Sequence, residues 1–200
     1  MKQKHKKKTS KKGRGGKILF LLILIGMIAL IFSLFRPDIM NSLKPWLEKW
    51  SFVEKRKEVL LYFSDSEGDY LIGEKRKILK KNEVKQEAKE TILELVIGPK
   101  GKLIPTIPPQ TKLLTLQINE AGVAKVNFNP ALSKDHPGGS SAEMMTVYSI
   151  VNSLALNFSQ IKRVQILIDG KPIETIAGHL SLRQPISPKP DLIKRQIKRQ

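Results

Sequence analysis

Hydrophobic residues follow one another without a charged residue over positions 18–35, a stretch of 18 residues near the start of the chain. As a helix it would be about 27 Å long, which is close to the hydrocarbon thickness of a bilayer. Because the stretch is apolar on every side, it predicts a transmembrane helix rather than a buried helix of a soluble domain. The predicted membrane-spanning positions include Ile18, Leu22, Gly26, Leu30 and Phe35.

The positive charges on either side of this stretch predict its direction. Residues 1–17 carry nine Lys or Arg and no acidic residue, whereas the twenty residues after the stretch carry four Lys or Arg. Because positive charge is retained in the cytoplasm, we expect a single-pass anchor with a cytoplasmic amino terminus and an extracytoplasmic carboxyl part. A cleaved signal peptide is the alternative, but the apolar stretch is longer than a usual signal core and no small-residue cleavage site follows it.

A short amphipathic pattern follows in residues 36–56. Leu43, Trp46, Leu47 and Trp50 recur at helical spacing, which places both Trp rings on one face. One interpretation is a helix at the outer membrane surface, where Trp is favoured at the level of the headgroups. The other is a helix packed on the next domain, or a linker, and the sequence leaves both open.

The pattern then changes to short strands and amphipathic helices. Residues 57–64 and 70–79 predict two strands, and a helix capped by Asn82 ends at Gly98-Pro99. A connection with four prolines over residues 98–112 excludes both a helix and a central strand there. Alternating residues in 114–118 and 124–128 predict a hairpin.

The remaining elements are a helix and short strands. Ser140 with Glu143 is typical of a capping box and predicts a helix after a loop at 130–139. Val164, Ile166 and Ile168 predict a strand that returns over 172–176, and Leu180 with Leu182 predict a short last strand. The basic, proline-broken residues 187–200 predict a disordered tail.

This order of elements, β-β-α-β-β-α-β-β, predicts the α/β (α+β) fold class. Two amphipathic helices and six short strands suit a two-layer sandwich, with the helices on one face of a mixed sheet. The predicted core where helices meet sheet contains Phe128, Val151, Leu154 and Ile166. The predicted domain spans residues 57–186, between the linker and the tail.

The net charge of +18 is not by itself evidence for a nucleic-acid partner. Half of it lies in residues 1–17, where membrane topology already explains it. Nucleic-acid binding by this tail is therefore the less favoured interpretation. The absence of Cys excludes a disulfide framework, a thiolate metal site and a lipid-modified cysteine.

No arrangement of residues predicts catalysis, a metal site or a cofactor. The three His are His5 in the tail, His136 in a loop and His179 in a Gly-flanked turn. Asp135-His136 is best interpreted as exposed loop polarity, and His179 near Asp169 or Glu174 is a weak metal signal. Ser140 and Ser141 follow two glycines, but helix capping accounts for them and no base is predicted nearby.

The predicted domain nevertheless carries a series of short motifs in a distinctive order. They are Gly98-Pro99, Ile107-Pro108 leading to Thr111-Lys112-Leu113, GVAKVNF at 122–128, IVNSL at 150–154 followed by Phe158, VQILIDG at 164–170 and Gln184-Pro185. Together they resemble the GerM-type (GerMN) sporulation and spore germination domain family over residues 57–186. Asn127 stands where an Asp is usual and Ala155 where a Thr is usual, and only one copy of the domain is present.

The resemblance implies a ring-building-motif-like fold, which occurs in proteins that assemble into rings of the bacterial envelope. It implies a non-enzymatic, envelope-side interaction or assembly module at the cytoplasmic membrane, with envelope proteins as partners or as a homo-oligomer. A peptidoglycan-binding or cell-wall amidase-associated accessory protein is the alternative. A hydrolase is the third interpretation, and the missing catalytic constellation argues against it.

Overall fold

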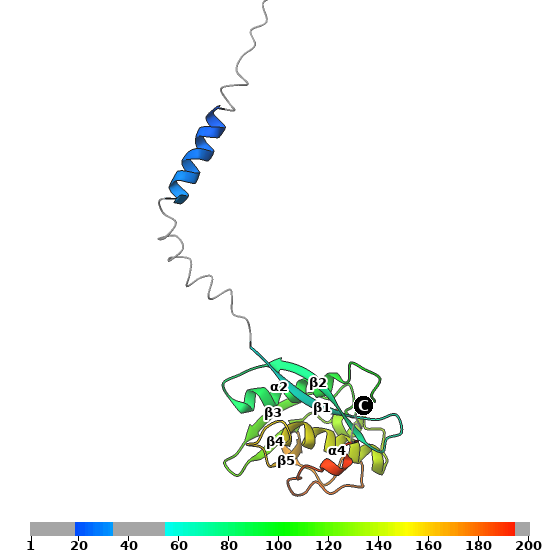
Figure 1. Ribbon diagram of the computed structural model, residues 1–200. Coiled ribbons are helices and arrows are strands. Elements are labelled where there is room, and N and C mark those ends of the chain that lie inside the picture. Colours follow the sequence, from blue (N-terminus) through cyan, green and yellow to red (C-terminus); the bar gives the residue numbers. More distant parts are fainter. Residues whose placement is uncertain (1–18, 34–54, 195–200) are drawn as a thin grey trace, which may run out of the picture. The chain divides into compact units, whose positions relative to one another are not determined.

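The computed structural model describes residues 19–33 and 55–194 (Figure 1). The chain divides into two compact units, Met1–Val53 and Glu54–Gln200. In the first unit, residues 19–33 are helical and their large apolar side chains are exposed. Within the described ranges, no helix has both the length and the apolar character to cross a bilayer. Ile18, Phe35, Trp46 and Trp50 lie outside the described residues, whereas Leu22, Gly26 and Leu30 lie in this helix.

The second unit begins with an antiparallel hairpin of β1 (Arg56–Ser64) and β2 (Leu71–Leu79). Helix α2 (Val84–Ile97) follows and ends at Gly98, whose φ of 94° is open to glycine at little cost. Both strands and the end of α2 confirm the sequence prediction. The predicted cap is wrong, because Glu83 rather than Asn82 occupies the N-cap and makes no side-chain capping bond.

The remaining strands form a four-stranded mixed sheet in the order β3-β4-β5-β6. The predicted hairpin is confirmed as β3 (Leu113–Ile118) and β4 (Val123–Phe128). Strand β5 (Arg163–Ile168) runs parallel to β4, and the two-residue β6 (Lys171–Pro172) is antiparallel to β5. The parallel pair is joined by a crossover that contains the four-residue α3 (Ala131–Lys134) and the long α4 (Ser140–Ala155).

The prediction of one mixed sheet in two layers is wrong, because the hairpin and the four-stranded sheet are separate. Both long helices contact strands of both sheets (Figure 1). Helix α4 and the turn after it also cover the outer edge of β1, where Asn157 of the turn accepts from the N–H of Leu60 at 2.9 Å and donates to its carbonyl at 2.7 Å. The Ser153 hydroxyl accepts from Tyr62 N–H at 3.0 Å. Side chains thus occupy the position that a neighbouring strand would take.

One hydrophobic core joins both sheets to both helices. The predicted core residues Phe128, Val151, Leu154 and Ile166 are all buried, which confirms that prediction. Helix α4 is buried almost all round between Met145 and Leu154, which places it at the centre of the domain rather than on one face of a sheet.

Two turns explain why particular residues occur in the sequence motifs. At Gly122, φ is 73° and an added Cβ would lie 2.8 Å from the carbonyl oxygen of Gln160, so a larger side chain would clash with backbone. Asn127 accepts from Gly170 N–H at 2.7 Å and so ties β4 to the Asp169-Gly170 turn. Only the side-chain oxygen is used in this bond, so the carboxylate usual at this position could accept it equally well.

The carboxyl-terminal part differs from the prediction. No strand covers residues 173–182, and the predicted return strand is limited to β6. Residues 187–194 are not a disordered tail but pack on the domain, where Asn152 exchanges two hydrogen bonds with the backbone of Lys189, at 2.9 and 3.1 Å. A 3-10 turn, η1 (Pro190–Leu192), leads to Ile193, which pairs with Leu71. Residues 195–200 lie outside the described residues.

We expect Leu154→Ala to lower the free energy of unfolding of the full chain by about 2–5 kcal/mol, because it removes a fully buried side chain and leaves a cavity. Chemical denaturation followed by circular dichroism measures the change. Leu156→Ala is the matched control, because this leucine lies at the C-cap of α4 and its side chain is 42% exposed. It should change stability by less than about 1 kcal/mol. Equal losses for the two variants would contradict the central position of α4.

Candidate functional site

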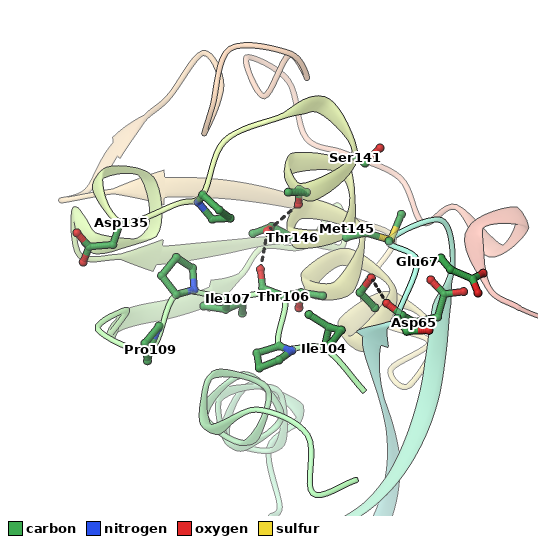
Figure 2. Close-up of a pocket in the computed structure, with 17 residues that line it drawn as sticks. Asp65, Glu67, Ile104, Thr106, Ile107, Pro109, Asp135, Ser141, Met145 and Thr146 are labelled. Atoms are coloured by element: carbon green, nitrogen blue, oxygen red, sulfur yellow. Dashed lines mark hydrogen bonds between the residues drawn. The ribbon is translucent and has the colours of Figure 1, made fainter. Parts of the chain in front are cut away.

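A pocket of about 500 Å³ opens beside the amino-terminal end of α4 (Figure 2). Three segments line it: the β1–β2 turn at 64–68, the proline-rich connection at 104–109, and residues 135–146. The connection is held in place by an antiparallel bridge between Ser64 and Ile104, with hydrogen bonds of 2.9 and 3.2 Å. The predicted proline-rich connection therefore forms one wall of the pocket.

The pocket combines an apolar interior with acidic groups. Ile107 and Met145 are buried, and Ile104 and several prolines add apolar surface. Its ionisable lining residues are Asp65, Glu67 and Asp135, and no Lys or Arg lines it within the described part of the chain. The pocket suits a ligand that has an apolar portion and a positive charge.

The carboxylate of Asp65 is already engaged in the turn. It accepts from the backbone N–H groups of Asp69 and Tyr70 at 3.1 and 3.2 Å and pairs with the Lys194 ammonium at 3.1 Å. Burial raises the pKa of Asp65, but the hydrogen bonds from Tyr70, Lys194 and Asp69 outweigh it and hold the pKa below its usual value. The exposed Glu67 and Asp135 are therefore the carboxylates most open to a ligand.

A chain of hydroxyl groups joins the pocket wall to α4. Thr106 donates to Ser149 at 2.7 Å, and Thr146 donates to the carbonyl of Thr106. His136 contacts the Thr146 hydroxyl through Nε2 at 3.0 Å and accepts from Gly138 N–H through Nδ1, also at 3.0 Å. Both ring nitrogens are thus engaged, so the prediction that His136 is merely exposed loop polarity is wrong.

His136 is arranged to be neutral. Burial lowers its pKa, and the negative charge of Glu143 and a contact with the backbone of Ala142 only partly oppose this. A nitrogen that accepts from Gly138 N–H also carries no proton itself. The ring is therefore a hydrogen-bonding link between the 135–138 loop and α4.

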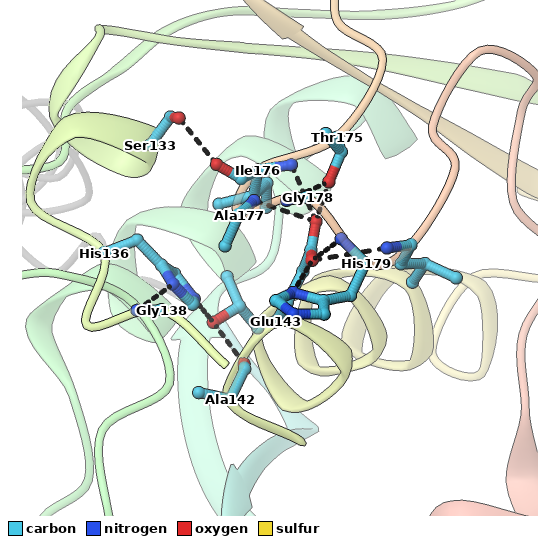
Figure 3. A network of polar contacts seen from close by, with 12 residues as sticks. Ser133, His136, Gly138, Ala142, Glu143, Thr175, Ile176, Ala177, Gly178 and His179 are labelled. Atoms are coloured by element: carbon cyan, nitrogen blue, oxygen red, sulfur yellow. Dashed lines mark hydrogen bonds and ion pairs between the residues drawn. The ribbon is translucent and has the colours of Figure 1, made fainter. Parts of the chain in front are cut away.

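A second polar cluster is centred on Glu143, whose side chain is completely buried (Figure 3). One carboxylate oxygen accepts from the N–H groups of Ile176 and Ala177 at 2.8 and 3.0 Å and from the Thr175 hydroxyl. The other accepts from the N–H groups of His179 and Leu180 at 2.7 and 3.3 Å. A single side chain of α4 thus fixes the irregular 175–180 loop.

The sequence suggested a different role for Glu143. The capping box is wrong, because Gly139 occupies the N-cap with φ of 85° and Ser140 makes no capping bond. A Glu three residues after a Ser is typical of a capping box, and nothing in the sequence marks a partner loop more than thirty residues away. The one available signal was that Glu143 is the only charged residue of this helix.

The environment of Glu143 keeps it ionised. Burial raises the pKa of a carboxyl group, but the Thr175 hydroxyl and the N–H groups of Ala177, His179 and Ile176 lower the pKa of Glu143 to about 2. His179 adds a contact from Nδ1 at 3.3 Å, so the imidazole lies beside Glu143 rather than Asp169 or Glu174. Across residues 19–33 and 55–194, no three His, Asp or Glu side chains are grouped to hold a metal ion.

The predicted nucleophile candidates do not join either cluster. Ser140 and Ser141 are exposed, and Ser141 lies at the rim of the pocket. Neither ring nitrogen of His136 is directed at them, because both nitrogens bond to other groups. His5 lies outside the described residues. The polar side chains of these clusters bind backbone and one another, which is a positioning role.

We expect Glu143→Gln to destabilise the domain by roughly 3 kcal/mol at neutral pH, the free energy that corresponds to the lowered pKa. Because the pKa of Glu143 is lower in the folded than in the unfolded state, its carboxylate stabilises the fold above about pH 4.5. This stabilisation is lost as the pH falls toward 2. The difference between wild type and variant in urea denaturation should therefore shrink over that range. Glu174→Gln, at an exposed surface pair with Arg183, is the matched control. A difference that does not change with pH would contradict this assignment.

The domain matches the model of a known family. The Germane family, described as sporulation and spore germination, matches residues 60–174. No curated protein matches the chain.

Similar solved structures come from two bacteria. A protein of Clostridium perfringens that is provisionally called a lipoprotein is 23% identical with a TM-score of 0.49, covering 71% of this chain and 95% of that one. The first GerMN domain of the Bacillus subtilis sporulation protein GerM is 23% identical with a TM-score of 0.49, covering 70% of this chain and 98% of that one. The tandem GerMN domains of the same protein are 22% identical with a TM-score of 0.49, and the match covers 66% of this chain and 45% of that one.

The family model alone matches more than half of the 200 residues. The chain therefore belongs to the Germane family of sporulation and spore germination domains, as the motifs at 98–185 indicated.

Proposed function

We propose that the protein is an anchored, non-enzymatic interaction or assembly module on the outer side of a bacterial cytoplasmic membrane. The observation that carries the proposal is the order of parts along the chain: nine positive charges, an apolar stretch at 18–35, and a Germane-family domain. Anchoring confines the domain to one membrane face, which raises the effective concentration of identical or neighbouring domains. Weak contacts between envelope proteins can then become productive.

The polar chemistry of the domain supports binding over catalysis. His136 is neutral and uses both ring nitrogens, and Glu143 uses both carboxylate oxygens to hold backbone. A general base needs a free nitrogen or oxygen within reach of a substrate proton. These two groups are therefore better suited to fixing loops than to moving protons.

A second candidate function is binding of peptidoglycan, alone or as an accessory of a cell-wall amidase. The acidic, partly apolar pocket favours it, because Glu67 and Asp135 could pair with an amino group of a cell-wall peptide. This function uses the same anchored topology. The two candidates differ in whether the domain retains isolated peptidoglycan in the absence of other proteins.

We expect an alkaline phosphatase fusion after Gln200 to be active, because the excess of Lys and Arg before the apolar stretch retains the amino terminus in the cytoplasm. The matched control replaces the nine Lys and Arg of residues 1–17 by Gln and should lose activity in part of the population. An active cytoplasmic reporter at the same position in the unaltered chain would reverse the proposed topology.

The function itself is tested by cross-linking in intact cells, followed by identification of the proteins or wall fragments attached to the domain. We expect specific attachment that disappears when residues 1–35 are removed, because the local concentration falls. The purified protein should show no turnover of peptidoglycan, esters or peptides. Turnover that is lost in His136→Ala, Ser140→Ala or His179→Ala would contradict the non-enzymatic proposal.

A further inference from the structure

The β1–β2 hairpin has two outer edges, and within residues 55–194 hydrogen bonds cover more of the β1 edge than of the β2 edge. Leu60 directs its N–H and C=O away from β2 to Asn157, so Leu60 and its partner Lys75 form a non-hydrogen-bonded pair. Such pairs alternate along an antiparallel ladder, which makes Tyr62–Gly73 and Glu58–Lys77 pairs of the same kind. The N–H and C=O groups of Gly73, Lys75 and Lys77 therefore point outward from the free edge of β2.

The neighbouring contacts agree with this assignment. On β1, the outward groups of Tyr62 and Ser64 bond to Ser153 and Ile104. On β2, the outward carbonyl of Leu71 accepts from Lys194 N–H at 2.8 Å, and Ile193 pairs with Leu71 in parallel. Beyond that bridge, no hydrogen bond from the described residues reaches the outward backbone of Gly73, Lys75 or Lys77.

The side chains along this edge are basic. Lys75, Lys77 and the following Lys80 are exposed, and the one ion pair that Lys75 makes within the described residues is with Glu58, which is also exposed. Glu74, the single acidic residue of β2, is engaged by Arg76 at 2.7 Å and by the backbone N–H groups of Lys100 and Gly101. Across the part of the chain that the structure describes, the edge thus presents backbone groups without a hydrogen-bond partner beside more lysines than acidic residues.

We propose that the edge of β2 at Gly73–Lys77 binds an extended acidic segment of a partner protein by strand addition. Asp or Glu at alternate positions would lie opposite Lys75 and Lys77, while the backbones exchange hydrogen bonds. A second copy of β2 would place lysines against lysines. The chain's own residues 195–200 include Arg195, Lys198 and Arg199 and no acidic residue, so their charge does not complement this edge. This proposal rests on the proposed interaction role.

The test uses the full chain in detergent micelles and a synthetic probe of about ten residues that alternates Val with Glu. We expect the probe to slow amide hydrogen exchange in residues 71–79 and to bind more weakly as salt rises. A probe that alternates Val with Lys should do neither. Lys75→Pro should weaken binding at least about tenfold, because proline removes an outward N–H without breaking the β1–β2 ladder.

A charge variant covers the case in which Lys75→Pro disturbs the hairpin. Lys75→Glu with Lys77→Glu should weaken binding by about fivefold or more. Lys125→Glu, at an exposed lysine of the central strand β4, is the matched control and should leave binding unchanged. No protection by the acidic probe, or equal effects of the two charge variants, would overturn the proposal.

The other occupants give different results, and each would also overturn it. Protection in the absence of probe that disappears on deletion of residues 195–200 would assign the edge to the chain's own tail. Protection that rises with protein concentration would assign it to a second copy. If cross-links form in cells through other surfaces but the acidic probe does not bind, the strand-addition proposal is refuted and the proposed interaction role is not. Probe binding without any cross-linked partner in cells would refute the proposed interaction role.

Discussion

The contact between Glu143 and the 175–180 loop is the constraint on which much of the domain depends. The loop has no strand or helix of its own, so its backbone N–H groups need acceptors elsewhere. One buried carboxylate supplies acceptors for four of them. The cost of burying a charge is offset because every donor is already oriented when the fold forms. The start of α4 and the carboxyl-terminal third of the domain are thereby fixed to each other.

Other polar side chains of α4 also hydrogen-bond to backbone groups outside the helix. These buried polar residues bond to backbone groups that have no hydrogen-bond partner on a neighbouring strand. Ser153 satisfies the edge of β1, Asn152 holds the segment at Lys189, and Thr146 holds the wall at Thr106. The central helix therefore explains how the two sheets share one core, which the two-stranded hairpin in particular needs because it would be marginally stable alone.

The way these polar groups are bonded bears on function. The hydrogen-bonding atoms of His136 and Glu143 contact other groups of the domain, and the described residues also form two charged surfaces, the acidic pocket and the basic edge of β2. They lie on different parts of the hairpin, the pocket at its turn and the edge along its second strand. Opposite charges on two surfaces of one domain favour partners that differ in charge, and tethering to a membrane would strengthen such weak contacts.

The sequence by itself determined, to within one residue at each end, the strands at 56–64, 71–79, 113–118, 123–128 and 163–168, and it also determined both long helices and the core positions Phe128 and Leu154. It did so because alternation, helical periodicity and glycine turns act within a few residues. It also determined the family, because the motif glycines and turns have local causes. The transmembrane anchor and the Trp pair stay predictions.

Only the tertiary structure decided which strands pair beyond the β3–β4 hairpin and what the polar residues of α4 bind. The alternation of β1 and β2 is compatible with one mixed sheet, and an edge covered by Asn157 and Ser153 leaves no mark on that pattern. Glu143 looked like a local cap because its true partners lie at 175–180. Residues 187–194 looked like a tail because their contacts, Asn152 and Asp65, are also distant in sequence. Pairings over such separations depend on how the whole chain packs, which local periodicity does not encode.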